Sequence, residues 1–188
     1  MFPLFVYGQT ANEYFDSGNT KAKFGDYKGA ITDYTKAISL NPDFPKAYLN
    51  RGFSKDNLKD YNGAIADYTK AIEIDPDYAK AYFDRGCKKA ELKDFNGAIT
   101  DYTKAISLNP DFPKAYLNRG VTKSKLKDYY GAIADYTKAI EIDPDYANAY
   151  FNRANGKYFL GLNSCKDYSK SCELGYQKGC EYFNQDCK

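Results

Sequence analysis

Residues 29–52, GAITDYTKAISLNPDFPKAYLNRG, decide the fold, because the same letters recur as residues 97–120. A second stretch, residues 63–79, GAIADYTKAIEIDPDYA, recurs unchanged as residues 131–147. Each copy lies 68 residues from its original, and the two stretches resemble each other at half that distance, so the period is 34 residues. A fixed period of this length is typical of a solenoid, in which each repeat buries its apolar face by stacking on its neighbours.

Each repeat is predicted to contain two helices. Small and apolar residues recur at spacings of three and four around residues 47–52 and again around residues 64–72, with a break between them. An Asn-Pro or Asp-Pro pair ends each second helix, because a residue before proline is pushed out of the α region. The aspartates predicted to cap the starts of the second helices are Asp26, Asp60, Asp94 and Asp128.

The two helices of a repeat are predicted to touch through small residues facing a large one. Such alternation lets neighbouring helices interdigitate at close range. The recurring small residues are Gly18, Gly52, Gly86 and Gly120, then Ala30, Ala64, Ala98 and Ala132, then Ala37, Ala71, Ala105 and Ala139, and the large partners are Tyr34, Tyr68, Tyr102 and Tyr136.

This spacing of small and large residues resembles the tetratricopeptide repeat, a 34-residue helix–turn–helix unit. The resemblance implies an all-α solenoid of αα-hairpins wound as a right-handed superhelix. It covers four full repeats, followed by a degenerate fifth repeat with a cysteine-rich capping helix at residues 147–188. The four repeats are residues 11–44, 45–78, 79–112 and 113–146.

One repeat position departs from the family, which usually has an aromatic residue where this chain has lysine. One interpretation lays the lysine stems over a helix interface with their ammonium groups in water, and it is the one we prefer from sequence. The other pairs the lysines with the recurring Asp33, Asp67, Asp101 and Asp135. The lysines are Lys21, Lys55, Lys89, Lys123 and Lys157.

The amino-acid composition argues against catalytic, nucleic-acid-binding and membrane-spanning functions. The chain has no histidine, the commonest general base and metal ligand, and a stack of near-identical repeats has no single catalytic centre. Its 27 basic and 25 acidic residues give a net charge of +2 and form no basic run, so we expect no nucleic-acid partner. No stretch approaches the roughly 20 apolar residues of a membrane span. We expect no enzyme activity, no cofactor and no metal.

The resemblance implies a function in binding. In the family, the first helices line a concave wall that binds peptide segments or partner helices, without chemistry. The alternative is that the apolar residues there only pack adjacent first helices together. The candidate partner-binding residues are Lys46, Leu49, Asn50, Phe53 and Asn57 in the second repeat, Lys80, Phe83, Asp84, Cys87 and Glu91 in the third, and Lys114, Leu117, Asn118, Val121 and Lys125 in the fourth.

Some family members grip a C-terminal carboxylate with five basic or polar side chains. Asn19, Asn50 and Lys80 match that pattern here, but Phe15 replaces a lysine and Asp84 replaces an arginine. We therefore do not expect this clamp.

Four of the five cysteines lie in the last 24 residues. Cys172 and Cys180 flank a predicted turn at Gly175, and Cys165 and Cys187 lie seven residues further out on either side. Seven residues span about two helical turns, so the thiols can face each other across an antiparallel hairpin, which predicts the bonds Cys172–Cys180 and Cys165–Cys187. Reduced, buried thiols and a four-thiolate metal site are the alternatives, although the spacings do not fit the usual C-x2-C pairs.

Residues 172–180, CELGYQKGC, also resemble the cysteine-bridged αα-hairpins of Sel-like repeat proteins, which are exported. Disulfides indicate an oxidising compartment, periplasmic or secreted, with a cytoplasmic location as the alternative. The apolar start, MFPLFVY, has Val6 and Gly8 at the spacing of a signal-peptide cleavage site before Gln9. It is either the remnant of such a peptide or a segment that packs on the first helix.

Two rival functions follow from the repeats. Near-identical repeats can stack end to end or pair between chains, so a monomer and a weak homo-oligomer are both compatible with the sequence. A hydrolase activity, as suggested for cysteine-rich Sel-like relatives, is the less favoured rival, because no paired carboxylates break the repeat pattern. Cys87 stands where the neighbouring repeats have Phe53 and Val121, which predicts a half-buried apolar role.

Overall fold

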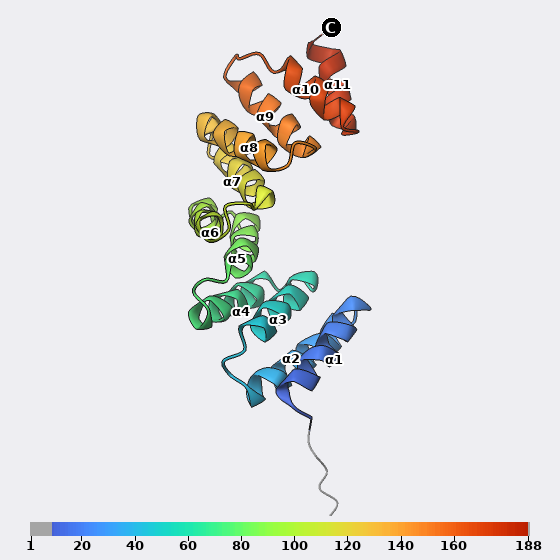
Figure 1. Cartoon of the computed structure of the whole chain (residues 1–188), viewed down its shortest axis with the longest axis vertical. Helices are drawn as coiled ribbons and strands as arrows, with labels where there is room; N and C mark the ends of the chain where they lie inside the picture. Colours follow the sequence, from blue (N-terminus) through green and yellow to red (C-terminus); the bar gives the residue numbers. More distant parts are fainter. Residues whose placement is uncertain (1–8, 188) are drawn as a thin grey trace, which may run out of the picture. The chain divides into compact units, whose positions relative to one another are not determined.

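The computed structural model describes residues 9–187, and within that range the chain folds into eleven helices with no strand (Figure 1). The expected all-α hairpin fold is confirmed. The segment that resembles a signal peptide lies almost entirely outside the described residues. The helices are α1 (Ala11–Lys23), α2 (Tyr27–Leu40), α3 (Pro45–Asn57), α4 (Tyr61–Ile74), α5 (Ala79–Glu91), α6 (Phe95–Leu108), α7 (Pro113–Lys125), α8 (Tyr129–Ile142), α9 (Ala147–Phe159), α10 (Cys165–Glu173) and α11 (Gln177–Asp186).

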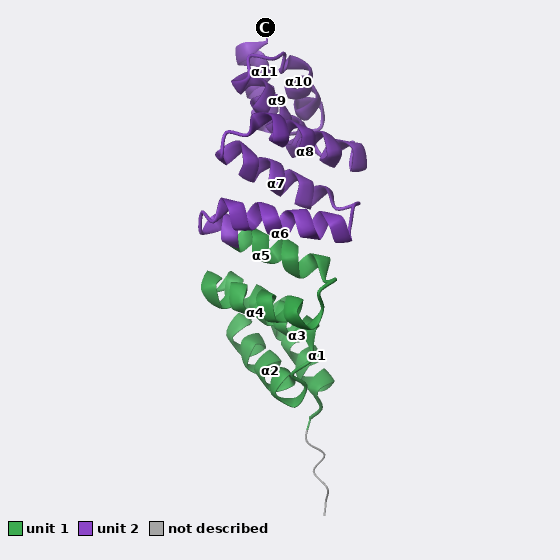
Figure 2. Ribbon diagram, turned by 90° about the vertical axis from the view of Figure 1, so that its left-hand side faces the viewer, with its two compact units in different colours: residues 1–88 green, residues 89–188 purple. Residues whose placement is uncertain are grey.

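The chain divides into two compact units, residues 1–88 and 89–188, and the boundary falls inside α5 (Figure 2). In unit 1, α1 pairs with α2, α3 pairs with α4, and α2 packs on α3. In unit 2, α6 packs on α7, α7 pairs with α8, and each later helix up to α11 packs on the one before it. Within each unit, hairpins therefore stack through neighbours in sequence, as the repeat predicts.

The helix starts follow the predicted capping. The carboxylate of Asp60 accepts a hydrogen bond of 2.9 Å from the backbone N–H of Gly63, and the other three capping aspartates bond their glycines in the same way. A Cβ on Gly63 would collide with Oδ2 of Asp60, so this capping geometry requires glycine. Pro45 and Pro113 occupy the first turns of α3 and α7, where a missing N–H costs nothing.

Within the hairpins, a fully buried tyrosine of the second helix lies over a glycine of the first. Tyr136 is 1% exposed, and a Cβ on Gly120 would lie 2.6 Å from its ring and 3.2 Å from the carbonyl oxygen of Ala132. The helices can approach this closely only because no side chain separates them. The same contact joins Gly18 with Tyr34 and Gly52 with Tyr68.

A buried aspartate connects the two helices of a hairpin through an arginine, and the same arginine reaches the hairpin before it. Arg51 on α3 donates two hydrogen bonds, of 2.9 and 2.7 Å, to the carboxylate of Asp67 on α4, and a third, of 3.1 Å, to the hydroxyl of Thr35 on α2. One guanidinium therefore connects three helices, since its fork of donors is rigid. The equivalent sets in unit 2 are Arg119 with Asp135 and Thr103, and Arg153 with Asp167 and Thr137.

The recurring lysines join these clusters, so our preferred interpretation of free ammonium groups was wrong. Lys55 lies 2.8 Å from Asp67, and all five lysines pair with their aspartates at 2.6 to 2.8 Å. The stems cross the helix interface as expected, but each ammonium ends on a carboxylate that burial would otherwise leave uncompensated. The first repeat has Ser17 in place of arginine, and its hydroxyl donates to Asp33 at 2.6 Å.

The cysteine-rich end forms a disulfide-bonded hairpin of α10 and α11. The bonds link Cys165 with Cys187 and Cys172 with Cys180, which is the pairing that the spacing predicts. The Cα atoms of the two pairs lie 5.6 and 4.5 Å apart. Among the described residues, Cys87 is the cysteine that forms no disulfide, and it is half-buried.

We expect Gly120→Val to lower the free energy of unfolding by about 1–3 kcal/mol, because the new side chain must displace the Tyr136 ring from a packed interface. Equilibrium urea unfolding followed by circular dichroism measures this. Ala134→Val, at an exposed position of α8, is the control and reports the cost of valine in a helix, less than about 0.7 kcal/mol. Equal losses in the two variants would contradict the packing argument.

Asp167→Asn tests the buried carboxylate. Burial alone would raise the pKa of Asp167, but the hydrogen bonds from Arg153 and Lys157 outweigh it and hold this pKa below its usual range. The ion pair therefore stabilises the fold above the unfolded pKa of about 4 and is lost as the pH falls through the folded pKa. We expect a loss of about 2 kcal/mol at pH 7 that shrinks below pH ~4, as measured by urea unfolding at both pH values. A loss independent of pH would refute this.

Removing the Cys165–Cys187 bond by serine substitution at both positions should destabilise the terminal hairpin by about 2–4 kcal/mol, because the unfolded hairpin gains conformational freedom. Amide hydrogen exchange in α11 measures the loss, and Cys87→Ser is the matched control, since Cys87 forms no disulfide. Unchanged protection of α11 would show that packing alone holds it.

Candidate functional site

The first helices present the residues that the sequence selects, with very different exposure. Leu49, Phe83 and Leu117 are 8–9% exposed, and Phe53 is 49% exposed. Lys46, Asn57, Lys80, Glu91, Lys114 and Lys125 are exposed, while Asn50, Asp84, Cys87, Asn118 and Val121 are half-buried.

Most of the apolar residues that were expected to form an exposed strip along the first helices are buried. Leu49 packs in a core cluster with Ala64 and Tyr68, and Leu117 packs in the matching cluster with Ala132 and Tyr136. These leucines are buried because they close the interface between adjacent helices, which is the alternative that the sequence left open. Little of them remains for a partner to contact.

The asparagines of the first helices partly serve the fold. In unit 1, the amide nitrogen of Asn50 donates to Oδ1 of Asn19 at 2.7 Å, and the Tyr34 hydroxyl donates to the same oxygen at 2.9 Å. This network connects α1, α2 and α3, so Asn50 acts first as a structural residue.

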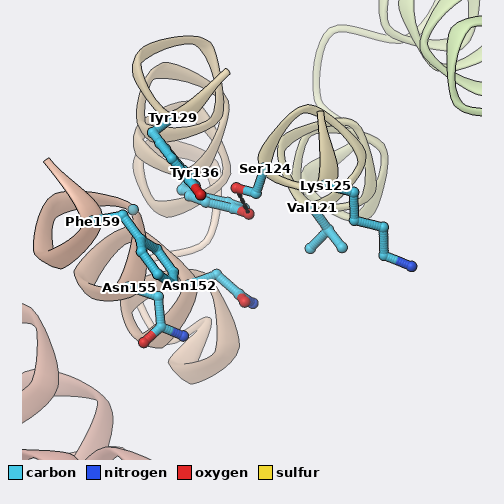
Figure 3. Close-up of a pocket in the computed structure, with 9 residues that line it drawn as sticks. Val121, Ser124, Lys125, Tyr129, Tyr136, Asn152, Asn155 and Phe159 are labelled. Carbon is cyan, nitrogen blue, oxygen red and sulfur yellow. Dashed lines mark hydrogen bonds between the residues drawn. The ribbon is translucent and has the colours of Figure 1, made fainter. Parts of the chain in front are cut away.

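Unit 2 holds a pocket of about 310 Å³ on this face, between α7, α8 and α9 (Figure 3). In Figure 3, α7 and α9 supply opposite walls, and the two tyrosines come from α8. The predicted residues Val121 and Lys125 are part of the lining. The described residues that line it are Val121, Ser124, Lys125, Tyr129, Tyr136, Asn152, Asn155, Gly156 and Phe159.

The pocket has aromatic walls. The rings of Tyr129 and Phe159 stack with centroids 5.0 Å apart and planes 15° apart. Phe159 is 64% exposed, so the stacked pair has a free edge at the mouth of the pocket. An aromatic surface of this kind favours contact with flat, apolar groups.

Hydrogen-bonding groups line the rest of the pocket. The hydroxyls of Ser124 and Tyr136 lie 3.1 Å apart, joined by the dashed line in Figure 3. Burial raises the pKa of Tyr136 to about 12, so its hydroxyl stays protonated at neutral pH. Asn155 accepts a bond of 2.8 Å from the hydroxyl of Tyr168 through its oxygen, which fixes its amide at the wall.

The equivalent place in unit 1 is occupied by charged side chains. Lys88 stands where unit 2 has Gly156, and its ammonium lies 2.8 Å from Asp56 and 5.2 Å from the centroid of the Tyr61 ring. Lys88 is 8% exposed, so its stem fills space that glycine leaves empty. Burial raises the pKa of the nearby Asp84, and the ammonium of Lys80 opposes this shift.

A second hollow of about 360 Å³ lies on the other side of the Phe159 wall, between α9 and α11. It shares Asn155 and Phe159 with the first pocket and adds residues of α11, the helix that the disulfides attach to α10. Its remaining lining residues are Tyr158, Tyr182, Gln185 and Asp186.

Most of the pocket escaped the sequence analysis, although a signal was present. Residues 45–78 and 113–146 differ at only five positions, and three of the changes, at Val121, Ser124 and Lys125, line the pocket. Comparing the two near-copies would have indicated this end of α7. The α9 residues, which lie in the degenerate repeat, carry no such signal.

Among residues 9–187, no group of three or more cysteine, aspartate or glutamate side chains is placed to hold a metal ion. In the same range, no helix combines the length and apolar character that crossing a membrane requires.

Comparisons with solved structures match nearly the whole chain. A crystal structure of MamA is 27% identical with a TM-score of 0.81, and the match covers 87% of this chain and 96% of that one. MamA from Desulfovibrio magneticus RS-1 (17%, TM-score 0.77, 97% and 100% covered) and YrrB (17%, 0.80, 93% and 92%) share the fold. YrrB is described as a TPR protein with an unusual peptide-binding site. The comparison with curated proteins found no match.

Two family models match the repeats directly. The tetratricopeptide repeat model matches residues 45–78 and 113–146, and a TPR repeat model matches residues 18–55 and 89–127. Together they cover residues 18–78 and 89–146, which is more than half of the chain. With its buried Tyr–Gly contacts and 34-residue hairpins, the chain belongs to the tetratricopeptide repeat family.

Proposed function

We propose that this protein is a non-enzymatic scaffold that binds a peptide segment on the face of its first helices, with its main site in the unit 2 pocket. The tetratricopeptide fold supports a protein–protein interaction scaffold. The observation that carries the proposal is the pocket itself, because aromatic rings, hydroxyls and amides converge there from three helices.

The size of the site favours a peptide over a cofactor or a large metabolite. At about 310 Å³ the pocket is at the small end of ligand sites, and its Phe159 wall is mostly exposed. A side chain anchored there would leave its backbone along the face that carries Asn118, Asn152 and Asn155, whose amides suit an extended peptide. The two hollows on either side of Phe159 offer places for two side chains of one segment.

The two disulfides fit an oxidising compartment, and we propose that the protein is exported to a periplasmic or extracellular location. There the bonds would preserve the position of α11, one wall of the second hollow, against thermal fraying.

A displayed library of random 12-residue peptides, selected against the full chain, tests the proposal. We expect enriched peptides to bind with micromolar affinity and to lose at least tenfold in affinity on Asn152→Glu, which places a charge in the face of α9. Thr100→Glu, at an exposed position of the second-helix surface on α6, is the matched control and should leave binding unchanged. Equal loss in both variants, or no enriched peptide, would refute the proposal.

Self-assembly of the near-identical repeats is the second candidate function. It predicts a mass that rises with protein concentration, as measured by light scattering. A monomer mass that stays constant over the protein concentrations at which peptides bind would rule out self-assembly and leave peptide binding as the proposed function.

A further inference from the structure

We infer that the unit 2 pocket selects one aromatic side chain with a carboxylate-bearing residue beside it, and that unit 1 is closed to the same ligand at the equivalent place. This inference rests on the proposed peptide-binding function and specifies its ligand. The α7 and α8 walls come from a near-copy of residues 45–78, whereas α9 differs from α5 at seven of 13 positions, so the differences between the two places are concentrated on α9.

The walls of the pocket suit a flat ring. Tyr129 and Phe159 are stacked, and Val121 lies on the opposite wall, so an inserted ring meets aromatic and aliphatic carbon on both sides (Figure 3). Offset stacking and edge contacts make aromatic pairs more favourable than their buried area alone. The pocket volume of about 310 Å³ is large enough to hold one aromatic side chain.

Two changes between the units open this space. Gly156 stands where unit 1 has the buried Lys88, and Ser124 stands where unit 1 has Asp56. In unit 1, the ion pair of Lys88 with Asp56, at 2.8 Å, lies over the ring of Tyr61, which is the counterpart of Tyr129. In unit 1 the lysine ammonium therefore lies over this ring, whereas in unit 2 the position of the lysine is a glycine and Phe159 stacks on Tyr129.

A third change supplies the aromatic wall. The position of Phe159 on α9 corresponds to Glu91 at the end of α5, 68 residues earlier in the chain. The fifth repeat therefore has a ring where the third repeat has a charged side chain. Because this ring stacks on Tyr129, the change extends the apolar surface of the pocket toward solvent.

Charge defines the second part of the ligand. Lys125 is the one charged residue among the nine described residues that line the pocket. It is exposed on α7, and its side chain points away from Phe159 in Figure 3, with its ammonium 5.5 Å from the ring centroid of Phe95 on α6. The second repeat has the uncharged Asn57 at this position. On the far side of Phe159, the second hollow carries Asp186. A carboxylate on the neighbouring ligand residue is thus favoured where the ligand passes α7 toward α6, and disfavoured toward α11.

The test transplants the closure of unit 1 into unit 2 with the double variant S124D/G156K. A Cβ on Gly156 would lie 3.0 Å from the side chain of Ile133. The position equivalent to Ile133 in unit 1 is also an isoleucine, Ile65, and Lys88 is accommodated there, so a lysine at position 156 has room to fit. Peptides enriched on the wild-type chain from the random 12-residue library are measured against both proteins by fluorescence anisotropy. Each peptide is also measured with its aromatic residue replaced by alanine.

We expect the enriched peptides to share one aromatic residue with an adjacent Asp or Glu. Replacing the aromatic residue should weaken binding to the wild-type chain at least tenfold, and S124D/G156K should weaken the parent peptide as much. On the double variant, the alanine replacement should then have little further effect, because the two changes remove the same contact. Lys125→Asn should weaken acidic peptides about threefold and erase most of their salt dependence.

Phe159→Glu provides a second variant that does not depend on how a lysine fits at position 156. Phe159 is mostly exposed, and the variant introduces only the residue type that the chain already has at the equivalent position 91. It should weaken binding at least tenfold, with an unchanged circular dichroism melting curve.

The two levels of the proposal fail in different ways. Peptides that bind S124D/G156K and Phe159→Glu as tightly as wild type, while still losing affinity on Asn152→Glu, overturn this inference but leave the proposed function standing. Enriched peptides without a shared aromatic residue do the same. No enriched peptide at all overturns both.

Discussion

The contact of a buried tyrosine ring with a bare helix backbone is the constraint on which the rest of this structure depends. Gly120 and its counterparts let the paired helices approach until the ring touches backbone, and a Cβ there would lie 2.6 Å from the ring. This close approach brings the buried aspartate of the second helix within reach of the arginine and lysine of the first. The ion-pair cluster in turn reaches the threonine of the preceding hairpin and sets the stacking.

The ion pairs with arginine and lysine explain how these stacked helical hairpins tolerate buried aspartates. Each aspartate is nearly inaccessible, and an isolated carboxylate would be costly there. An arginine fork and a lysine supply three charge-assisted contacts, so the carboxylate is satisfied, and the guanidinium also fixes the register between hairpins. We expect this polar cluster to give the stacking a specificity that apolar side chains of variable shape would not provide.

The same repeat also explains why the candidate site is local. Identical repeats present identical surfaces, so a site arises only where the sequence departs from its own copy. Those departures gather at the C-terminal end of α7 and on α9, where a glycine replaces a buried lysine and an aromatic ring replaces a glutamate. The terminal hairpin, fixed by two disulfides, extends this surface with α11. The repeated residues form the helical framework, and the residues that depart from the repeat form the candidate binding pocket.

The sequence by itself determined the hairpin fold and the helix caps, and it predicted the cysteine pairing that the structure shows, because each depends on local spacing that repeats or mirrors within a few turns. It also determined that Lys55 and Asp67 belong to one interface, but not that they pair, since the outcome depends on how deeply Asp67 is buried. Only the tertiary structure decided that Leu49 and Leu117 close the core while Gly156 opens a pocket. Exposure and empty volume are properties of packed neighbours from several helices, and no single helix encodes them.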